Sequence, residues 1–453
     1  MHTSDQMQRL PTEILVMTFK KAIQCSAPGD HYTSLTCFML VCRRWRDTLI
    51  GDTTLWSLIT ISGRESVPHA LRSVNRSGCS RLTVDLVWSL STPPDDIHPL
   101  LEQLADRSHR LASFKLATRY FPPLPQWASL AANLHTLVLR NGGSSQTLNN
   151  FINGPLPRLR YLVLEGFRSW PAGRFCNLHQ VTLKVPHDHG TVSSAALLDL
   201  LNASPELRGF NISGCKRVPS LPPSSKAVAL PHLTLLNIHA SSVHDILCHM
   251  SLPSTVEIRF TKCINAIGVL LERASLSHLG DSLTALSTLA VALDTDHSII
   301  VLRSFAHGRT SPSLVVAEEL PPGSKTAAVK ILEDYAILPA FSSVEELIVI
   351  ANASFRLRWK AWLSNFPALQ RLTIRTCNPD AFYTAIRREL GFNPTLYPTP
   401  RSSSASSTRS IHIDWRATSS LIRYYLTFED ISSMPLRRKG HGIVSRMKPR
   451  GVV

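Results

Sequence analysis

The amino-acid sequence predicts an α/β protein in which a module of three short helices precedes a solenoid, with a parallel sheet on one side and helices on the outer side. Two observations support this prediction. Apolar residues recur at helical spacing in the first sixty residues, and from about residue 80 a short leucine-rich pattern returns repeatedly. The length of 453 residues exceeds what one compact domain usually needs. A small module joined to an extended repeat array agrees with that length.

The first helix is predicted to begin at Pro11. Proline suits the first helical position because its missing N–H would be unpaired there, and Glu13 lies in the first turn, where the helix dipole favours an acid. Ile14, Leu15 and Phe19 then form an apolar stripe at helical spacing. One face of this helix therefore requires a packing partner.

A second apolar stripe follows a helix-breaking loop at 26–30. Its members recur every three to four positions and are Leu35, Phe38, Met39, Cys42 and Trp45. Leu49, Leu55 and Trp56 are expected to close the module as a third piece. A unit of about fifty residues lies near the small end of what folds alone, so its many large apolar residues suggest that another protein completes its surface. The alternative is a plain helical cap on a larger domain.

Two blocks in this region, in this order, resemble the F-box. They are Leu10-Pro11-x-Glu13-Ile14-Leu15 and Val41-Cys42-Arg43-x-Trp45-Arg46, with Leu55-Trp56 behind them. The resemblance covers roughly the first sixty residues and is to F-box-like proteins of the fungal type; the link at 24–33 is longer and more polar than usual. It implies a module that docks on the adaptor subunit of a cullin–RING (SCF-type) ubiquitin ligase. The docking residues it implies are Leu10, Pro11, Ile14, Leu15, Val41, Cys42, Trp45 and Trp56.

The repeated pattern is a leucine, two variable residues and then an apolar-x-apolar segment. Six consecutive copies begin 19 to 29 residues apart, at Leu111, Leu134, Leu159, Leu178, Leu207 and Leu233, and two later copies begin at Val344 and Leu369. The alternating segment predicts a strand that buries every second side chain. Helices are predicted between strands at 192–201, 242–250 and 357–366. The period resembles that of irregular leucine-rich repeats, whose units stack into a solenoid. An ordinary α/β domain whose strands happen to start with leucine is the alternative.

We place the domain boundaries at 1–60 for the F-box-like module and 61–395 for the repeats. The repeat register cannot be assigned at about 263–341, where strand-like runs persist at 286–291, 299–302 and 314–316 and a helix is expected at 324–338. A Ser/Pro-rich linker or loop at 396–410 is followed by an expected last strand and helix at 411–436. The basic segment 437–453 is expected to be a disordered tail.

Composition indicates an intracellular protein. The 48 Lys and Arg against 32 Asp and Glu give a net charge of +16, which favours acidic partners, although the charge is spread along the chain. The nine cysteines are odd in number and show no metal-ligand spacing, so they are expected to be reduced thiols. No signal sequence or membrane-spanning run is apparent, and we expect a cytoplasmic or nuclear protein that binds no membrane.

A search for catalytic motifs finds no nucleophile elbow, phosphate-binding glycine loop or zinc-protease helix. The nearest metal-like clusters are His187-Asp188-His189 and the group His244, Cys248 and His249, which we interpret as ordinary surface or core residues. We therefore expect a protein that is not an enzyme, without catalytic residues, metal or cofactor.

Binding is instead expected on the open face of the sheet. Strand alternation turns pairs of residues away from the core, including Val138 with Arg140 and Thr373 with Arg375. The candidate target-binding residues on this face are Arg140, Glu165, Lys184, Asn211, Asn237, His239 and Arg375. The function predicted is a substrate-recognition adaptor of an SCF-type ubiquitin ligase, with the ligase adaptor subunit and a target protein as partners. The alternative is a leucine-rich-repeat scaffold without a ligase. A nucleic-acid binder driven by the positive charge is a further, less favoured possibility.

Overall fold

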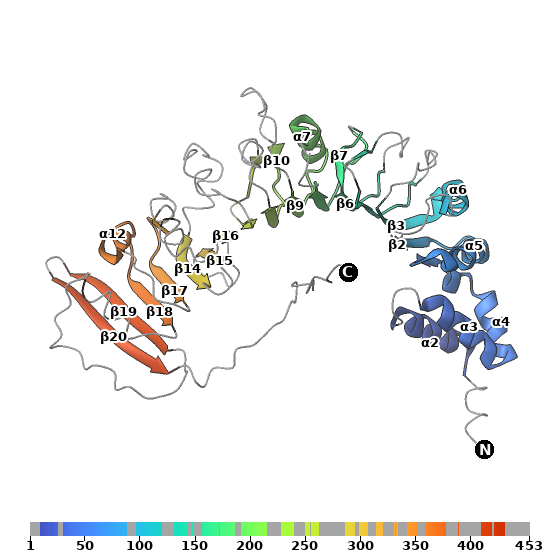
Figure 1. Cartoon of the computed structure of the whole chain (residues 1–453), viewed down its shortest axis with the longest axis horizontal. Coiled ribbons are helices and arrows are strands. Elements are labelled where there is room, and N and C mark those ends of the chain that lie inside the picture. Colours follow the sequence, from blue (N-terminus) through green and yellow to red (C-terminus); the bar gives the residue numbers. More distant parts are fainter. Residues whose placement is uncertain are drawn as a thin grey trace, which may run out of the picture.

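The chain forms an α/β structure with a large sheet and an N-terminal helical module, as a computed structural model shows (Figure 1). The strands lie side by side along an arc, and the helices between them lie on its outer side. The structure describes residues 10–25, 30–87, 97–119, 131–143, 146–148, 156–171, 173–185, 192–214, 228–239, 250–253, 255–261, 286–294, 299–306, 314–319, 330, 332–333, 342–351, 358–376, 388, 409–418 and 421–430.

The N-terminal module contains three helices, as the sequence predicts, but the second and third helices divide the chain at another place than expected. They are α2 (Thr12–Cys25), α3 (His31–Val41) and α4 (Arg43–Gly51), followed by a 3-10 turn, η1 (Thr53–Trp56). The second apolar stripe does not run through one helix, because Cys42 is extended (φ −160°, ψ 166°) and separates α3 from α4. The Cys42 Sγ accepts a hydrogen bond from the Trp45 backbone N–H at 3.5 Å. This cysteine therefore caps α4.

Aromatic packing joins the three helices. The Phe19 ring on α2 stacks on Phe38 of α3 at 5.2 Å between centroids and meets Trp45 of α4 edge-on at 5.0 Å. Leu15 and Leu49 are buried beside them. Leu15 and Phe19 of the predicted apolar stripe thus lie on the inner face of the module, whereas Ile14, also assigned to that stripe, is 44% exposed.

The main sheet begins with nine parallel strands. They are β1 (Leu58–Ile61), β2 (Leu82–Val87), β3 (Leu111–Thr118), β4 (Thr136–Asn141), β6 (Tyr161–Glu165), β8 (Gln180–Lys184), β9 (Gly209–Ser213), β11 (Leu235–His239) and β13 (Glu257–Thr261), paired in that order. β1 starts at Leu58 and therefore crosses the boundary placed after residue 60. The module leads into the sheet without an intervening linker.

The six consecutive copies of the pattern form neighbouring strands in register. Leu137 of β4 pairs with Leu162, which pairs with Val181, and Phe210 and Leu236 continue the row. These residues and the leading leucines are almost completely buried. Each copy therefore buries its apolar positions against those of its neighbours.

Helices cover the outer side of the sheet. α5 (Val67–Arg76) and α6 (His98–Asp106) connect the first strands, α7 (Ser194–Asn202) follows β8, and α12 (Trp359–Leu363) lies between the last parallel strands. α7 and α12 confirm two predicted helices. Of the helix expected at 242–250, only Met250 is described, and it begins a short strand.

Short elements complete the connections: η2 (Arg64–Ser66), η4 (Ser108–Arg110), β5 (Gln146–Thr147) paired with β7 (Phe167–Ser169), and β10 (Val228–Ala229) paired with β12 (Met250–Ser251).

The second part of the sheet departs from the regular repeat. β14 (Leu286–Asp294), β15 (Ile299–Ala306) and β16 (Leu314–Glu319) form an antiparallel meander at the three predicted strand-like runs. Parallel pairing resumes with β17 (Glu346–Ala351) and β18 (Arg371–Thr376). This meander explains why no single repeat register fits that part of the sequence.

Two long antiparallel strands end the sheet, β19 (Arg409–Thr418) and β20 (Leu421–Asp430). β19 confirms a strand near 411, whereas β20 stands where a helix was expected. The aromatic residues Tyr424, Tyr425 and Phe428 favour a strand there. The helix expected at 324–338 lies mostly outside the described residues, as do most of the Ser/Pro-rich linker and the whole basic tail.

Candidate functional site

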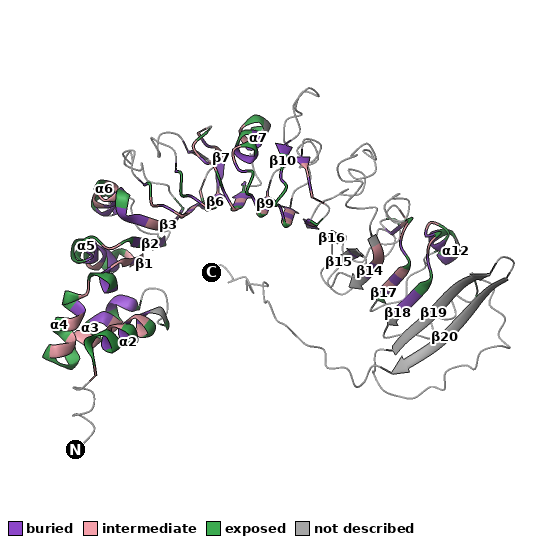
Figure 2. Cartoon of the chain, turned by 180° about the vertical axis from the view of Figure 1, so that it is seen from behind, coloured by how far each residue is buried: buried purple, intermediate pink, exposed green. Residues whose placement is uncertain are grey.

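The predicted docking residues of the helical module differ widely in exposure. Pro11, Ile14, Val41 and Cys42 are exposed, with 59% of Val41 open to solvent. Leu10 and Trp45 are half-buried. Figure 2 shows exposed positions along all three helices of the module. Exposed apolar side chains therefore remain on the module after its own core has formed.

One hydrogen bond joins the two blocks of the predicted motif, and a second fixes α4 to the end of α3. The Arg44 guanidinium donates to the backbone carbonyl of Leu10, which brings the start of α2 to the start of α4. The Arg46 Nε donates to the carbonyl of Met39 at 3.1 Å and fixes α4 against the end of α3. The Leu10-Pro11 and Val41-Cys42 segments thus lie near one another, although they are far apart in sequence.

Leu15 and Trp56, the remaining predicted docking residues, have buried side chains. Leu15 is 1% exposed and packs in the core of the module. The Trp56 Nε1 donates to the carbonyl of Leu49 at 2.7 Å, and the Arg76 guanidinium lies 4.5 Å from the Trp56 ring centroid. In this structure both side chains hold the module together rather than lying on its surface.

Three further large apolar side chains on the module are exposed and did not figure among the predicted docking residues. They are Met17 (65%), Leu40 (72%) and Ile50 (45%). Met17 follows Ile14 by three positions and so lies on the same face of α2. That helical spacing is the signal that could have identified Met17 from the sequence. Leu40 and Ile50 are next to predicted core or motif residues in the sequence, and only the folded structure shows that their side chains are exposed.

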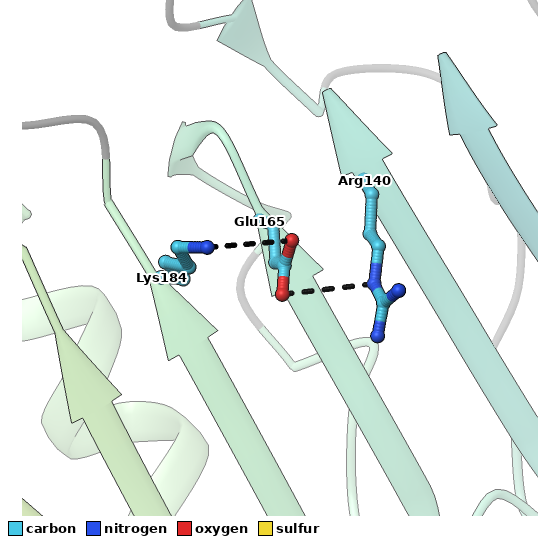
Figure 3. A network of polar contacts seen from close by, with 3 residues as sticks. All are labelled: Arg140, Glu165 and Lys184. Atoms are coloured by element: carbon cyan, nitrogen blue, oxygen red, sulfur yellow. Dashed lines mark ion pairs between the residues drawn. The ribbon is translucent and has the colours of Figure 1, made fainter. Parts of the chain in front are cut away.

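A charged group crosses three strands on the open face of the sheet (Figure 3). Glu165 of β6 forms ion pairs with Arg140 of β4, at 3.6 Å, and with Lys184 of β8, at 3.9 Å. The strand register explains the arrangement, because Glu165 pairs directly with both residues across the ladder. All three are candidate target-binding residues, and the structure brings them together.

The other candidate target-binding residues lie farther along the same sheet. Asn211 and Asn237 are partners in the β9–β11 register, and His239 lies next to Ser213. These side chains are half-buried on the face opposite the core. Arg375 lies in β18, and its side chain is outside the described residues. Thr373, expected on the open face, is 3% exposed, so the expectation of an open position there is wrong; its strand is paired on both sides, by β17 and β19.

A buried polar contact joins the module to the sheet. The His31 Nδ1 lies 2.6 Å from the Thr60 Oγ1, and the Tyr32 hydroxyl accepts a hydrogen bond from the Thr60 N–H at 3.3 Å. Burial lowers the pKa of His31 to about 4, against an opposing effect of the Leu58 backbone, and the His69 imidazole lowers it further. Burial also raises the pKa of Tyr32 to about 12. Both side chains are therefore uncharged at neutral pH.

The described residues contain neither a metal-binding group nor a membrane-spanning helix. Over the described ranges, His, Cys, Asp and Glu side chains do not gather in groups of three or more that could hold a metal ion. The clusters at 187–189 and 244–249 lie outside those ranges. Nor does any described helix combine the length and apolar character needed to cross a bilayer.

The geometry thus offers two candidate surfaces, an apolar one on the helical module and a polar one on the sheet. Comparison with known proteins adds no assignment to either. The chain matches no protein-family model, and no curated protein matches it.

Proposed function

We propose that the protein is a substrate-recognition adaptor of an SCF-type ubiquitin ligase. The helical module docks on the adaptor subunit of the ligase as an F-box does, and the leucine-rich-repeat sheet binds a target protein. The chain performs no chemistry itself. It acts by proximity, because holding a target lysine near a ligase-bound ubiquitin conjugate raises their effective concentration.

The observation that supports this proposal most is the apolar surface of the module. Among the described residues, eight large apolar side chains are exposed, and five of them lie on the module: Ile14, Met17, Leu40, Val41 and Ile50. Single exposed apolar residues are ordinary on a protein surface, but such a concentration on a unit of about fifty residues favours a protein partner. Val41 and Ile14 also belong to the two blocks that carry the F-box resemblance, and the Arg44 hydrogen bond to Leu10 links these blocks.

The test compares two substitutions of the same chemistry. Val41→Asp places a carboxylate on the module surface, whereas Val87→Asp does so at a 52% exposed valine of β2, outside the module. Co-purification of each full-length variant with the ligase adaptor subunit is measured. We expect Val41→Asp to weaken binding at least about tenfold, since a charge must be desolvated at an apolar interface, and Val87→Asp to leave it unchanged.

Both valines are exposed, so neither variant should unfold the chain, and a thermal melt checks this. A Leu10→Ala/Pro11→Ala double variant provides a second measurement in the predicted motif. Equal co-purification of all variants would reject docking through this surface.

The alternative is a repeat scaffold that is not linked to a ligase. The burial of Leu15 and Trp56 inside the chain favours it, because these two residues serve the fold itself. This alternative predicts that the adaptor subunit does not bind, even to the unmodified chain.

A further inference from the structure

A row of basic side chains stands at the edge of the sheet where the strands begin. It consists of His135, Arg160, His179 and Arg208, which precede β4, β6, β8 and β9, and we call it the basic row. Backbone hydrogen bonds link its members in sequence. The N–H of Arg160 donates to His135 at 2.9 Å, that of His179 to Arg160 at 2.8 Å, and that of Arg208 to His179 at 2.8 Å. The repeat therefore places one basic residue on each of four neighbouring strands.

The charges of the basic row act on one another. The pKa of His179 is lowered, first by burial and then by the positive charges of Arg160 and Arg208 on either side, while Glu206 opposes this effect. The two guanidinium groups thus lie close enough to disfavour a proton on the imidazole between them. An anion at this edge would relieve that repulsion.

Arg160 is held in place by the turns of the repeat. Its Nη1 donates to the carbonyls of Pro157, Leu159 and Asn177 at 3.0 to 3.2 Å. Arg208, in contrast, is exposed. The row therefore combines a fixed cation with an accessible one, on a rigid sheet edge that needs no rearrangement to bind.

Carboxylates balance the cations at the opposite edge but not here. Where the strands end, Glu165 pairs with both Arg140 and Lys184 (Figure 3). At the beginning of the strands, the Glu206 carboxylate lies 3.8 Å from the His232 Nε2, which makes an ion pair only where that imidazole is protonated. Within the part of the chain that the structure describes, the ion pairs between side chains leave out Arg160 and Arg208. The side chains of Arg160 and Arg208 therefore keep their positive charges without an ion pair, and the nearby Glu206 carboxylate offsets their effect on His179 only in part.

We propose that the basic row binds an extended, carboxylate-rich segment of the target protein, which crosses the beginnings of β4, β6, β8 and β9. This deepens the proposed function and rests on it for the source of the segment. Neighbouring strands lie about 4.8 Å apart, so the row spans about 14 Å, which an extended chain covers with about four or five residues. Carboxylates at alternate positions of such a segment lie about 7 Å apart, so two or three of them fit along the row and can reach the two arginines, which are two strands apart.

The experiment measures binding of a short fluorescent peptide of alternating glutamate and serine to the full chain, by anisotropy at low and at physiological salt. We expect saturable binding that weakens as salt rises, because the contact is electrostatic. Replacing glutamate with glutamine in the peptide should abolish it. An Arg208→Gln/His179→Gln double variant should bind about tenfold more weakly.

Lys21→Gln is the matched control, because it removes one positive charge from an exposed residue of α2, away from the row. It should bind the peptide as the unmodified chain does. Arg208 and His179 contribute only backbone groups to the ladder contacts named above, so the double variant should fold, and a thermal melt verifies it.

Three results would overturn the proposal. They are equal binding of the glutamine peptide, unchanged affinity in the double variant, and binding of a phosphoserine peptide without binding of the glutamate peptide. Because the ligase adaptor subunit is absent from this assay, its outcome is independent of the docking test on Val41.

Discussion

Gly214, directly after β9, has a left-handed backbone (φ +83°), and a Cβ at this position would lie 1.8 Å from the Val185 carbonyl oxygen. Gly173 also has a positive φ (+67°), but a Cβ there meets nothing within 4 Å. Gly214→Ala should therefore lower the free energy of unfolding by about 2–4 kcal/mol, from backbone strain and overpacking together, and Gly173→Ala by about 1 kcal/mol. Urea unfolding of both variants measures the difference. Equal shifts would show that the approach to Val185 imposes no constraint.

His31 makes the stability of the folded chain depend on pH. Its pKa is about 4 in the folded chain and 6.5 in the reference state, so the unfolded chain binds the additional proton between these values. This contribution to stability is present above about pH 6.5 and is lost as the pH falls toward 4. Thermal melts across that window should show a decline in melting temperature that is smaller in His31→Gln, whose side chain does not titrate. An identical decline in both would exclude His31 as its source.

The predicted docking residues show what sequence reasoning cannot decide for single residues. Helical spacing predicts that Ile14, Leu15 and Phe19 share a stripe, but it does not decide that Leu15 is buried while Ile14 remains 44% exposed. Trp56 was expected both to close the module with Leu49 and to dock, and the sequence does not decide between these roles; in the structure it is buried, with its Nε1 donating to the Leu49 carbonyl and Arg76 over its ring. Exposure depends on tertiary neighbours, which the sequence does not identify.

Secondary-structure elements were predicted best where local pattern and tertiary burial agree. The six consecutive strands follow the leucine pattern, since each apolar position faces the core in every copy. β13 was missed because Val256, Ile258 and Phe260 carry the alternation without a leading leucine. The break at Cys42 was missed because apolar spacing continues through it, whereas the backbone does not.

The turn η1 illustrates how one side chain can fix an element. Trp56→Phe keeps an aromatic ring but removes the donor to the Leu49 carbonyl, which would then be buried without this hydrogen bond. We expect a loss of about 1–3 kcal/mol in stability, measured by urea unfolding. Binding of the ligase adaptor subunit, measured by co-purification, should persist. A loss of that binding with unchanged stability would instead assign Trp56 to the docking surface.

At the scale of the whole molecule, the helical module and the sheet share one continuous core. Leu49, Leu55 and Trp56 belong to the same buried cluster as Ile59 and Ile61 of β1. The sequence predicted two units with a boundary near residue 60, because a change of periodicity marks where one pattern ends. The sequence does not reveal that the two units are packed together. His31 and Thr60 form a contact between them, but the residue types alone do not predict that these two side chains meet.

The strand order predicts which parts of the chain a destabilising substitution at one end of the sheet should affect. Each strand of the sheet pairs only with the strands next to it, so a loss of stability should spread mainly between adjacent units. Phe19→Ala removes a 2% exposed ring that packs on Phe38 and Trp45 and should cost about 3–5 kcal/mol within the module. Hydrogen exchange should then accelerate in α2–α4 and in β1, whose apolar residues pack in the same core, and remain unchanged in β17 and β18.

Leu372→Ala, at a fully buried leucine of β18, is the reciprocal control and should accelerate hydrogen exchange in β17 and β18 but not in α2–α4 and β1. If either variant accelerated exchange equally at both ends, the chain would unfold as one cooperative unit, and nearest-neighbour coupling would be rejected.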